Sequence, residues 1–200
     1  MHTLLASLGE TPAVVTECID ELAREGVGIG EVVVLYTKHT LPYFIALKID
    51  FRQGVYEGRI RCRGIELQMD DIRDTRDSLV YRTIVYKSIV EEQRKGRNVH
   101  LLISGGRKAM VVDSTLAALA AGLEQVYHVV LPQGYGVLRS ELLLPSYNLL
   151  SYVESDAPKD LVDKISEVCH PPIKRRMLIR IPLPKLNDEA VRSIVNSMLL

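Results

Sequence analysis

The stretch ISGGRKAM, residues 103–110, decides the fold because it joins two segments of opposite character. The residues before it, RNVHLL (97–102), form a short apolar run typical of a buried strand, and those after it, VVDSTLAALAAGL (111–123), have the pattern of a helix. Two glycines, then Arg107 and Lys108, stand where the strand would meet the helix. Because cations are unfavourable at the positive end of a helix dipole, we expect these two bases to serve another purpose.

Strand and helix patterns alternate along the chain on both sides of this turn. Apolar runs, β-branched or alternating, predict strands at residues 2–7, 31–37, 59–67, 98–104 and 125–132. Apolar residues at helical spacing predict helices at residues 11–26, 71–96 and 108–123. Residues 41–58 fit either a helix or an extended insertion. The first helix is expected to start with Thr11 as its N-cap and Pro12 at its first position.

The alternation of strands and helices predicts an α/β fold, a Rossmann-like doubly wound sheet that is mostly parallel and covered on both faces. After Pro132 the composition becomes loop-rich, so we divide the chain into a main domain, residues 1–132, and a small C-terminal α/β extension, residues 133–200. Patterns in the extension predict a helix at 158–168, a strand at 175–184 and a final helix at 187–200. We expect it to act as a dimerisation arm or a lid.

The bulk composition excludes several classes of protein. The chain has 200 residues, 47% of them hydrophobic, which suits a globular protein with a filled core. Its 25 basic residues balance its 25 acidic ones, so no global positive field would draw it onto long nucleic acid. Three scattered cysteines form no zinc pattern, and no apolar run approaches the roughly 20 residues that span a membrane. We therefore expect a cytoplasmic protein without a cofactor or a membrane partner.

Two turns are expected to line one crevice. In a doubly wound sheet, ligands bind beyond the carboxyl ends of the strands where the strand order reverses, here between the first and the fourth predicted strands. The turn after the first strand, residues 7–12, offers a serine hydroxyl and a glycine, and the turn after the fourth, residues 104–108, offers two glycines, an arginine and a lysine. Backbone amides, a helix N-terminus and two cations together suit a phosphate or another anion.

These turns allow other interpretations. A tight strand-to-helix turn with solvated bases would also explain residues 104–108. The dinucleotide fingerprint G-x-G-x-x-G and the P-loop G-x-x-x-x-G-K-[ST] are both absent, so neither nicotinamide binding nor nucleoside triphosphate hydrolysis fits.

The two turns together carry a resemblance to a known family. The sequence SLGETPAVVTE (7–17) and the later SGGRK (104–108) resemble the CRISPR-associated Rossmann-fold (CARF) domains, and within these the standalone ring nucleases of type III CRISPR systems. The resemblance covers residues 1–132, and nothing is carried over for residues 133–200. Such proteins are homodimers that bind cyclic tetra-adenylate, the second messenger of this antiviral defence, across the two-fold axis. Ring nucleases cleave this cyclic RNA without metal to linear di-adenylates with 2′,3′-cyclic phosphate ends, which switches off the signal.

The resemblance implies roles for particular residues. Ser7, Arg107 and Lys108 are expected to be catalytic, with the 2′-hydroxyl of the substrate as the nucleophile. Lys108 and the turn amides would stabilise charge on the phosphate, Arg107 would grip a non-bridging oxygen, and Ser7 would position the ribose hydroxyl or the phosphate. No strong general base is evident, which predicts a modest rate. The remaining residues expected to contact the ligand are Leu8, Gly9, Thr11, His39, Ser104, Gly105, Gly106 and Tyr135.

Some candidates also have simpler explanations. A solvated loop histidine would account for His39, a surface tyrosine for Tyr135 and a satisfied core residue for His128. The acidic run at residues 70–77 contains interleaved arginines and is more typical of a salt-bridged helix start than of a metal site.

Two rival functions remain. The first is a non-catalytic sensor that binds cyclic oligoadenylate and relays a dimer rearrangement to a partner through residues 133–200. The second is a DNA-binding regulator, which the neutral net charge and the lack of a clear helix-turn-helix disfavour.

Overall fold

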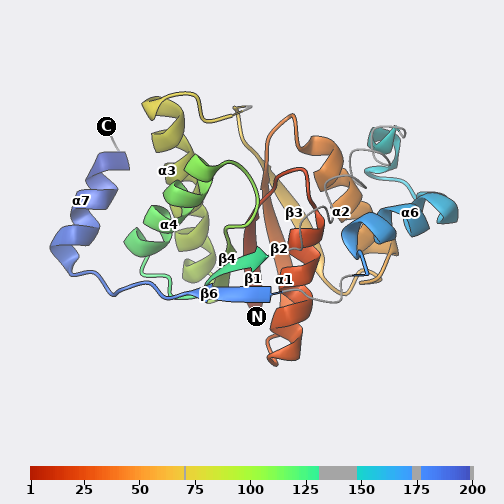
Figure 1. The fold of residues 1–200 in the computed structure, drawn as a ribbon, viewed down its shortest axis with the longest axis horizontal. Coiled ribbons are helices and arrows are strands. Elements are labelled where there is room, and N and C mark those ends of the chain that lie inside the picture. Colours follow the sequence, from red (N-terminus) through yellow and green to blue (C-terminus); the bar gives the residue numbers. More distant parts are fainter. Residues whose placement is uncertain (70, 131–147, 173–176, 199–200) are drawn as a thin grey trace.

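The computed structural model describes residues 1–69, 71–130, 148–172 and 177–198, and places a six-stranded sheet between two layers of helices (Figure 1). The strands are β1 (His2–Ser7), β2 (Ile29–Tyr36), β3 (Arg61–Glu66), β4 (Asn98–Leu102), β5 (Val126–Val130) and β6 (Met177–Ile181). The helices are α1 (Ala13–Arg24), α2 (Leu41–Gln53), α3 (Thr75–Arg94), α4 (Lys108–Ala120), α6 (Lys159–Cys169) and α7 (Asp188–Met198), with a short 3₁₀ helix at Leu149–Tyr152.

The strand order is β3-β2-β1-β4-β5-β6, and it reverses where the crevice is predicted. The first five strands are parallel, and β6 pairs antiparallel with β5. From β1 the chain builds outward to β2 and β3, then returns to the other side of β1 with β4, so the order reverses between β1 and β4. The predicted α/β fold with a doubly wound, mostly parallel sheet is confirmed, and β1 and β4 are the two predicted neighbours.

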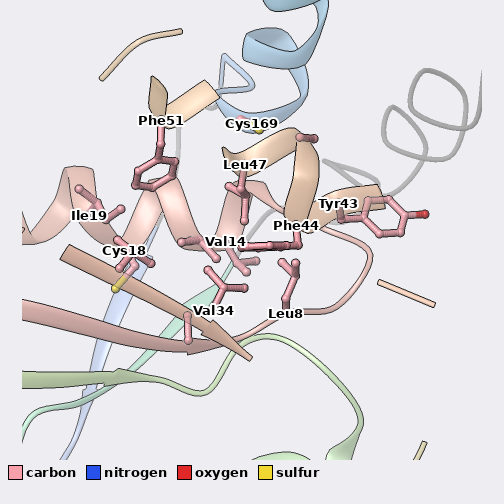
Figure 2. Packing of buried hydrophobic residues seen from close by; sticks show 14 of the residues in the cluster. Leu8, Val14, Cys18, Ile19, Val34, Tyr43, Phe44, Leu47, Phe51 and Cys169 are labelled. Carbon is pink, nitrogen blue, oxygen red and sulfur yellow. The ribbon is translucent and has the colours of Figure 1, made fainter. Parts of the chain in front are cut away.

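The central strands of the sheet are buried on both faces. Leu4 and Leu5 are successive residues of β1 and both fully buried, one in the cluster beneath α1, α2 and α6 and the other in the cluster beneath α3 and α4. Figure 2 shows the first cluster, with Phe44 and Leu47 of α2 gathered over Val34 of β2. Because both faces of these strands are buried, their sequences are continuous apolar runs and do not alternate between apolar and polar residues. The central strands are therefore rigid supports for the turns at their ends.

The ambiguous segment 41–58 begins with a helix, α2. Eight of its thirteen residues are buried, and these lie on nearly all sides of the helix: Tyr43, Phe44, Ile45, Ala46, Leu47, Ile49, Asp50 and Phe51. A helix that is apolar all round lacks the one-sided stripe by which a surface helix is recognised. This explains why the sequence pattern does not separate the helix from an extended insertion.

The predicted cap of the first helix is wrong. Helix α1 begins at Ala13, Pro12 occupies the cap position and no side chain caps the helix. The backbone carbonyl of Thr11 already accepts the N–H of Val14, at 3.3 Å. That amide is one that a Thr11 hydroxyl would have capped, so the side chain is not needed there.

Elements from residues 133–200 complete the layers on both faces. Strand β6 is the sixth strand of the sheet, α6 packs on α2, and α7 lies beside α3 and α4 (Figure 1). Two side chains of the α6 region, Ser166 and His170, each contact a carboxylate oxygen of the buried Asp50 at 2.8 Å. The boundary at residue 132, and the function of residues 133–200 as an arm or a lid, stay predictions. Across the described parts of the chain, no helix combines the length and apolar character needed to cross a bilayer.

A buried histidine in β4 makes the stability of the fold depend on pH. His100 is 4% exposed, its Nε2 lies 2.9 Å from Nδ1 of His2, and its ring stacks on Tyr127. Burial, together with the positive charges of His2 and Arg180, lowers the pKa of His100 to about 4. Nδ1 of His100 has no hydrogen-bond partner among the described residues, so a proton there would be buried without an acceptor.

We therefore expect the free energy of unfolding to fall as the pH drops from about 6.5, the ordinary histidine pKa, towards 4. In this pH range His100 binds a proton in the unfolded chain but not in the folded protein. The free energy of unfolding is therefore lower by about 3 kcal/mol at the acid end of the range. Urea titrations at several pH values measure this dependence of the free energy of unfolding on pH. His100→Gln should flatten this slope, whereas the exposed His39→Gln should keep it. An unchanged slope in His100→Gln would contradict the assignment.

Candidate functional site

The turns after β1 and β4 are locked against each other. We call residues 8–12 the β1 turn and residues 103–107 the β4 turn. Ser7, at the end of β1, donates from its hydroxyl to the carbonyl of Gly105 at 2.7 Å. A Cβ at Gly105 would lie 1.9 Å from the carbonyl oxygen of Ser7, and a Cβ at Gly9 would lie 3.0 Å from the nitrogen of Gly106. The two turns therefore approach at a distance that only glycine permits.

Gly106 also has a conformational reason to be glycine. Its φ is +92°, in the region that other residues avoid. The structure thus gives Gly105 and Gly106 roles in the packing of the two turns, and their predicted close approach to a ligand stays a prediction.

Arg107 and Lys108 stand at the start of α4, next to these glycines. Arg107 occupies the cap position in an extended conformation, and no side chain caps the helix, so the amides of the first turn of α4 have no side-chain acceptor. The Arg107 side chain is 74% exposed and forms an ion pair with Asp71, from the β3–α3 connection, at 3.1 Å. An exposed ion pair of this kind is weak and exchanges readily. Both basic side chains are thus available at a helix N-terminus, where an anion is favoured.

His39 and Thr11 lie on the opposite side of the β1 turn from α4. His39, in the connection between β2 and α2, is exposed, and its Nε2 lies 2.6 Å from a carboxylate oxygen of Glu10. This contact ties the β2–α2 connection to the β1 turn, where Thr11 is half-buried. The β1 turn and the connection after β2 are therefore joined by a contact between one histidine and one carboxylate.

Two other candidates have their contacts inside the fold. The side chain of Leu8 is 3% exposed and belongs to the apolar cluster drawn in Figure 2. The hydroxyl of Ser104 accepts the N–H of Val129 and lies 3.3 Å from Nδ1 of His128, so it ties β4 to β5. Their contacts with a ligand stay predictions, as does that of Tyr135, which lies outside the described residues.

Ser7 is more deeply placed than its expected role suggests. It is 3% exposed, and the partner of its hydroxyl is the Gly105 carbonyl. The direct contact between Ser7 and a ribose or phosphate stays a prediction. In the structure the Ser7 hydroxyl holds the β4 turn in place through the Gly105 carbonyl.

Sequence reasoning missed a buried tyrosine beneath the site. Tyr81 of α3 is fully buried, and its hydroxyl lies 3.1 Å from the hydroxyl of Ser114 of α4. Burial raises the pKa of Tyr81 to about 12, an effect that the hydrogen bonds from Ser114 and Ser7 reduce and the charge of Asp113 reinforces. The only signal in the sequence was a hydroxyl on an otherwise apolar helix face.

The acidic run before α3 forms the start of that helix. Asp74 accepts the N–H of Asp77 at 2.9 Å and so caps α3, and Asp77 accepts the N–H of Arg73 at 3.0 Å. The helix-start interpretation is confirmed for these residues, and the helix begins at Thr75, four residues later than predicted. Among the described residues, no group of three or more His, Cys, Asp and Glu side chains is arranged to hold a metal ion.

Comparison with solved structures gives a shared fold. The chain aligns with Csm6 of Enterococcus italicus, solved with cyclic hexa-2′-fluoro-hexa-dAMP, at a TM-score of 0.53 and 16% identity. The alignment covers 100% of this chain and 45% of Csm6, so the chain spans less than half of that protein. A type III CRISPR defence DNA nuclease activated by cyclic oligoadenylate aligns at a TM-score of 0.41 and 15% identity over 84% of this chain and 33% of its own. The Csm6 alignment is the one that supports a Rossmann-like fold consistent with a CARF domain.

Comparison with models of protein families shows the family to which the chain is related. No curated protein matches it. The model of the family described as CRISPR-associated protein NE0113 matches residues 11–198, which include nearly all of the chain and the whole of the β4 turn. A match of this extent shows common family membership, and the chain belongs to the CRISPR-associated NE0113 family.

Proposed function

We propose that this protein is a ring nuclease that binds cyclic tetra-adenylate across a homodimer two-fold axis and cleaves it without metal. Its products would be linear di-adenylates with 2′,3′-cyclic phosphate ends, and their formation would switch off type III CRISPR signalling. The observation that carries the proposal is the interlocked pair of glycine turns beside the N-terminus of α4, with Arg107 and Lys108 at its mouth. Membership of a CRISPR-associated family supports it.

The site suits the phosphates of a cyclic RNA. Helix N-termini bind anions through free amides and the helix dipole, and two adjacent cations strengthen this preference. A ring of four identical nucleotides has two-fold symmetry, so a symmetric dimer would present one such site to each half of the ring. Each protomer would then hold one scissile phosphate.

The cleavage requires that the attacking 2′-oxygen be positioned and that the negative charge of the phosphate be neutralised. The 2′-oxygen of a ribose attacks the neighbouring phosphorus, the bond from phosphorus to the 5′-oxygen breaks, and a 2′,3′-cyclic phosphate forms. The 2′-hydroxyl proton passes to solvent, and the departing 5′-oxygen takes up a proton. Holding the attacking oxygen in line supplies much of the acceleration. Two such cleavages convert the ring into two di-adenylates.

Arg107 and Lys108 have separate roles in this step. Lys108 neutralises negative charge as it grows on the phosphate oxygens, together with the turn amides. Arg107 leaves its exposed pairing with Asp71 and binds a non-bridging oxygen with two N–H groups. Ser7 holds the Gly105 carbonyl and thereby the shape of the turn.

Incubation of the pure protein with cyclic tetra-adenylate in excess EDTA tests the proposal. Mass spectrometry should show a linear di-adenylate with a cyclic phosphate end and no loss of rate with chelator. Cyclic hexa-adenylate in a parallel incubation should be cleaved more slowly. Ring cleavage that requires added divalent metal would contradict the metal-independent mechanism.

A second candidate is a sensor that binds cyclic oligoadenylate without cleaving it. The observation that favours it is the exposure of Met177 and Ile179 on β6, apolar side chains that would suit contact with a partner. In that case, the same incubation would return intact ring, still bound to the protein.

A further inference from the structure

The connection after β2 carries a histidine that is paired with a carboxylate of the β1 turn. Nε2 of His39 lies 2.6 Å from a carboxylate oxygen of Glu10, and these side chains are 66% and 41% exposed. The pair joins two connections that follow neighbouring parallel strands. A histidine held by a carboxylate is well suited to proton transfer, because the carboxylate orients the imidazole and stabilises its positive charge.

Two buried threonines fix the turn on which this histidine stands. Thr37 and Thr40 are 4% and 6% exposed. The N–H of Thr37 donates to the hydroxyl of Thr40 at 2.9 Å, and the N–H of Thr40 donates to the carbonyl of Thr37 at 3.1 Å. His39 lies between them, so an exposed side chain stands on a backbone that is held from within the fold.

The His39–Glu10 pair lies at the same edge of the sheet as the bases of α4. Strands β2, β1 and β4 are parallel neighbours, so their carboxyl ends meet at one edge. Neighbouring strands are about 4.8 Å apart, so the ends of β2 and β4 are about 10 Å apart with the β1 turn between them. Glu10 directly follows Gly9, and a Cβ at Gly9 would lie 3.0 Å from the nitrogen of Gly106. Arg107 is the next residue after that glycine.

Proton counting assigns the two ring nitrogens of His39. An ionised carboxylate can only accept a hydrogen bond, so Nε2 carries the proton in the contact with Glu10. The other nitrogen, Nδ1, has no hydrogen-bond partner among the described residues, and the side chain is largely exposed. Nδ1 is therefore the nitrogen that can take up a proton and give it away.

The pairing also accounts for a carboxylate beside a predicted phosphate site. Glu10 alone would repel an anion at this edge of the sheet. When His39 carries a proton on both nitrogens, the imidazolium and the carboxylate have no net charge. The same protonation state thus removes the repulsion and places a proton on Nδ1.

We propose that His39 is the general acid of ring cleavage and that Glu10 positions it. The proposal rests on the proposed function, because the reaction is the attack of a ribose 2′-oxygen on the neighbouring phosphorus. As the bond from phosphorus to the 5′-oxygen breaks, protonated His39 gives its Nδ1 proton to that oxygen. The 2′-hydroxyl proton passes to solvent. The imidazole keeps its Nε2 proton, which is bonded to Glu10, and afterwards regains a proton from water at Nδ1.

Cyclic tetra-adenylate with sulfur in place of the bridging 5′-oxygens tests this role. A thiol has a pKa of about 8.5, so the departing sulfur leaves as a thiolate and needs no acid. On the ordinary ring, His39→Gln should lower the cleavage rate constant about tenfold, less than the roughly 100-fold or more typical of a general acid, because water reaches this exposed position. On the sulfur-substituted ring, His39→Gln and the parent should cleave at rates within about twofold of each other. Lys108→Ala should lose rate on both rings, since the phosphate charge is present in both.

Glu10→Gln tests the positioning role, because it keeps the length of the side chain and removes its charge. It should lower the rate on the ordinary ring about threefold, as expected for an exposed pair. It should have no effect on the sulfur-substituted ring and no further effect in a His39→Gln background. The matched control is Glu124→Gln, which removes a carboxylate from an exposed ion pair with Lys185 at 3.1 Å. Glu124 precedes β5 and so lies at the opposite edge of the sheet, and its loss should leave both rates unchanged.

The outcomes separate this inference from the ring-nuclease proposal. If the parent cleaves the ordinary ring and His39→Gln cleaves it equally fast, only the general acid is overturned. An equal loss on both rings would also overturn it, because His39 would then act in binding and not in protonating the departing oxygen. If the parent cleaves neither ring, both proposals fail.

Discussion

Replacing Gly105 by alanine is expected to lower cleavage of cyclic tetra-adenylate by at least about 100-fold. The added Cβ would lie 1.9 Å from the carbonyl oxygen of Ser7, well inside van der Waals contact. The clash is with backbone, so no side-chain rotation relieves it, and the two turns must separate. The Ser7–Gly105 hydrogen bond is lost with that movement.

The same substitution should also destabilise the fold. Forcing atoms into a packed region costs roughly 1–3 kcal/mol. In a chain of this size, each kcal/mol lowers the melting temperature by about 2–4 °C. Gly28→Ala is the matched control, because a Cβ there meets nothing within 4 Å and it should change neither rate nor melting temperature. A Gly105→Ala protein with the activity of the parent would show that the β4 turn is not the catalytic turn.

Lys108→Ala should reduce the cleavage rate by about 100-fold or more while leaving the fold intact. The side chain is exposed at the first position of α4, so its loss opens no cavity. Removing a cation from a helix N-terminus even favours the helix dipole slightly. Quenched-flow or chromatographic assays of the ring, together with a thermal melt, would separate the two effects.

Charge and position can be distinguished with two further variants. Lys108→Arg keeps the charge and should recover part of the rate. Lys87→Ala removes an exposed lysine from α3, away from the β4 turn, and should leave the rate unchanged. Equal losses in Lys108→Ala and Lys87→Ala would mean that only the overall charge of the protein matters, and would contradict a phosphate contact by Lys108.

The sequence predicted the elements that carry a local signal. Strand β1 has the predicted limits, because His2–Ser7 is a short apolar run bounded by a turn. The pairing of β1 with β4 followed from the alternation of strands and helices, which predicts a doubly wound parallel sheet whose order reverses between these two strands. Gly105 and Gly106 were identifiable because glycine at a strand-to-helix turn indicates close approach or unusual backbone geometry.

What sequence reasoning missed depends on contacts between distant residues. The antiparallel pairing of Met177–Ile181 with β5 joins segments separated by more than forty residues, and a strand-like pattern does not name its partner. The bond between Tyr81 and Ser114 spans 33 residues, and that between Ser7 and Gly105 spans 98. Each hydroxyl by itself is an ordinary core residue, and only the fold brings each one to its partner.

The close approach of the two glycine turns has a consequence for redesign and for divergence within the family. Gly9 lies against the Gly106 nitrogen, and Gly105 lies against the Ser7 carbonyl. Each turn therefore leaves just the space that the other turn occupies. Grafting SGGRK alone onto another Rossmann-like scaffold would set it against a foreign loop with side chains in the way. The transplantable unit is the pair, and inheritance should have preserved or lost its two halves together.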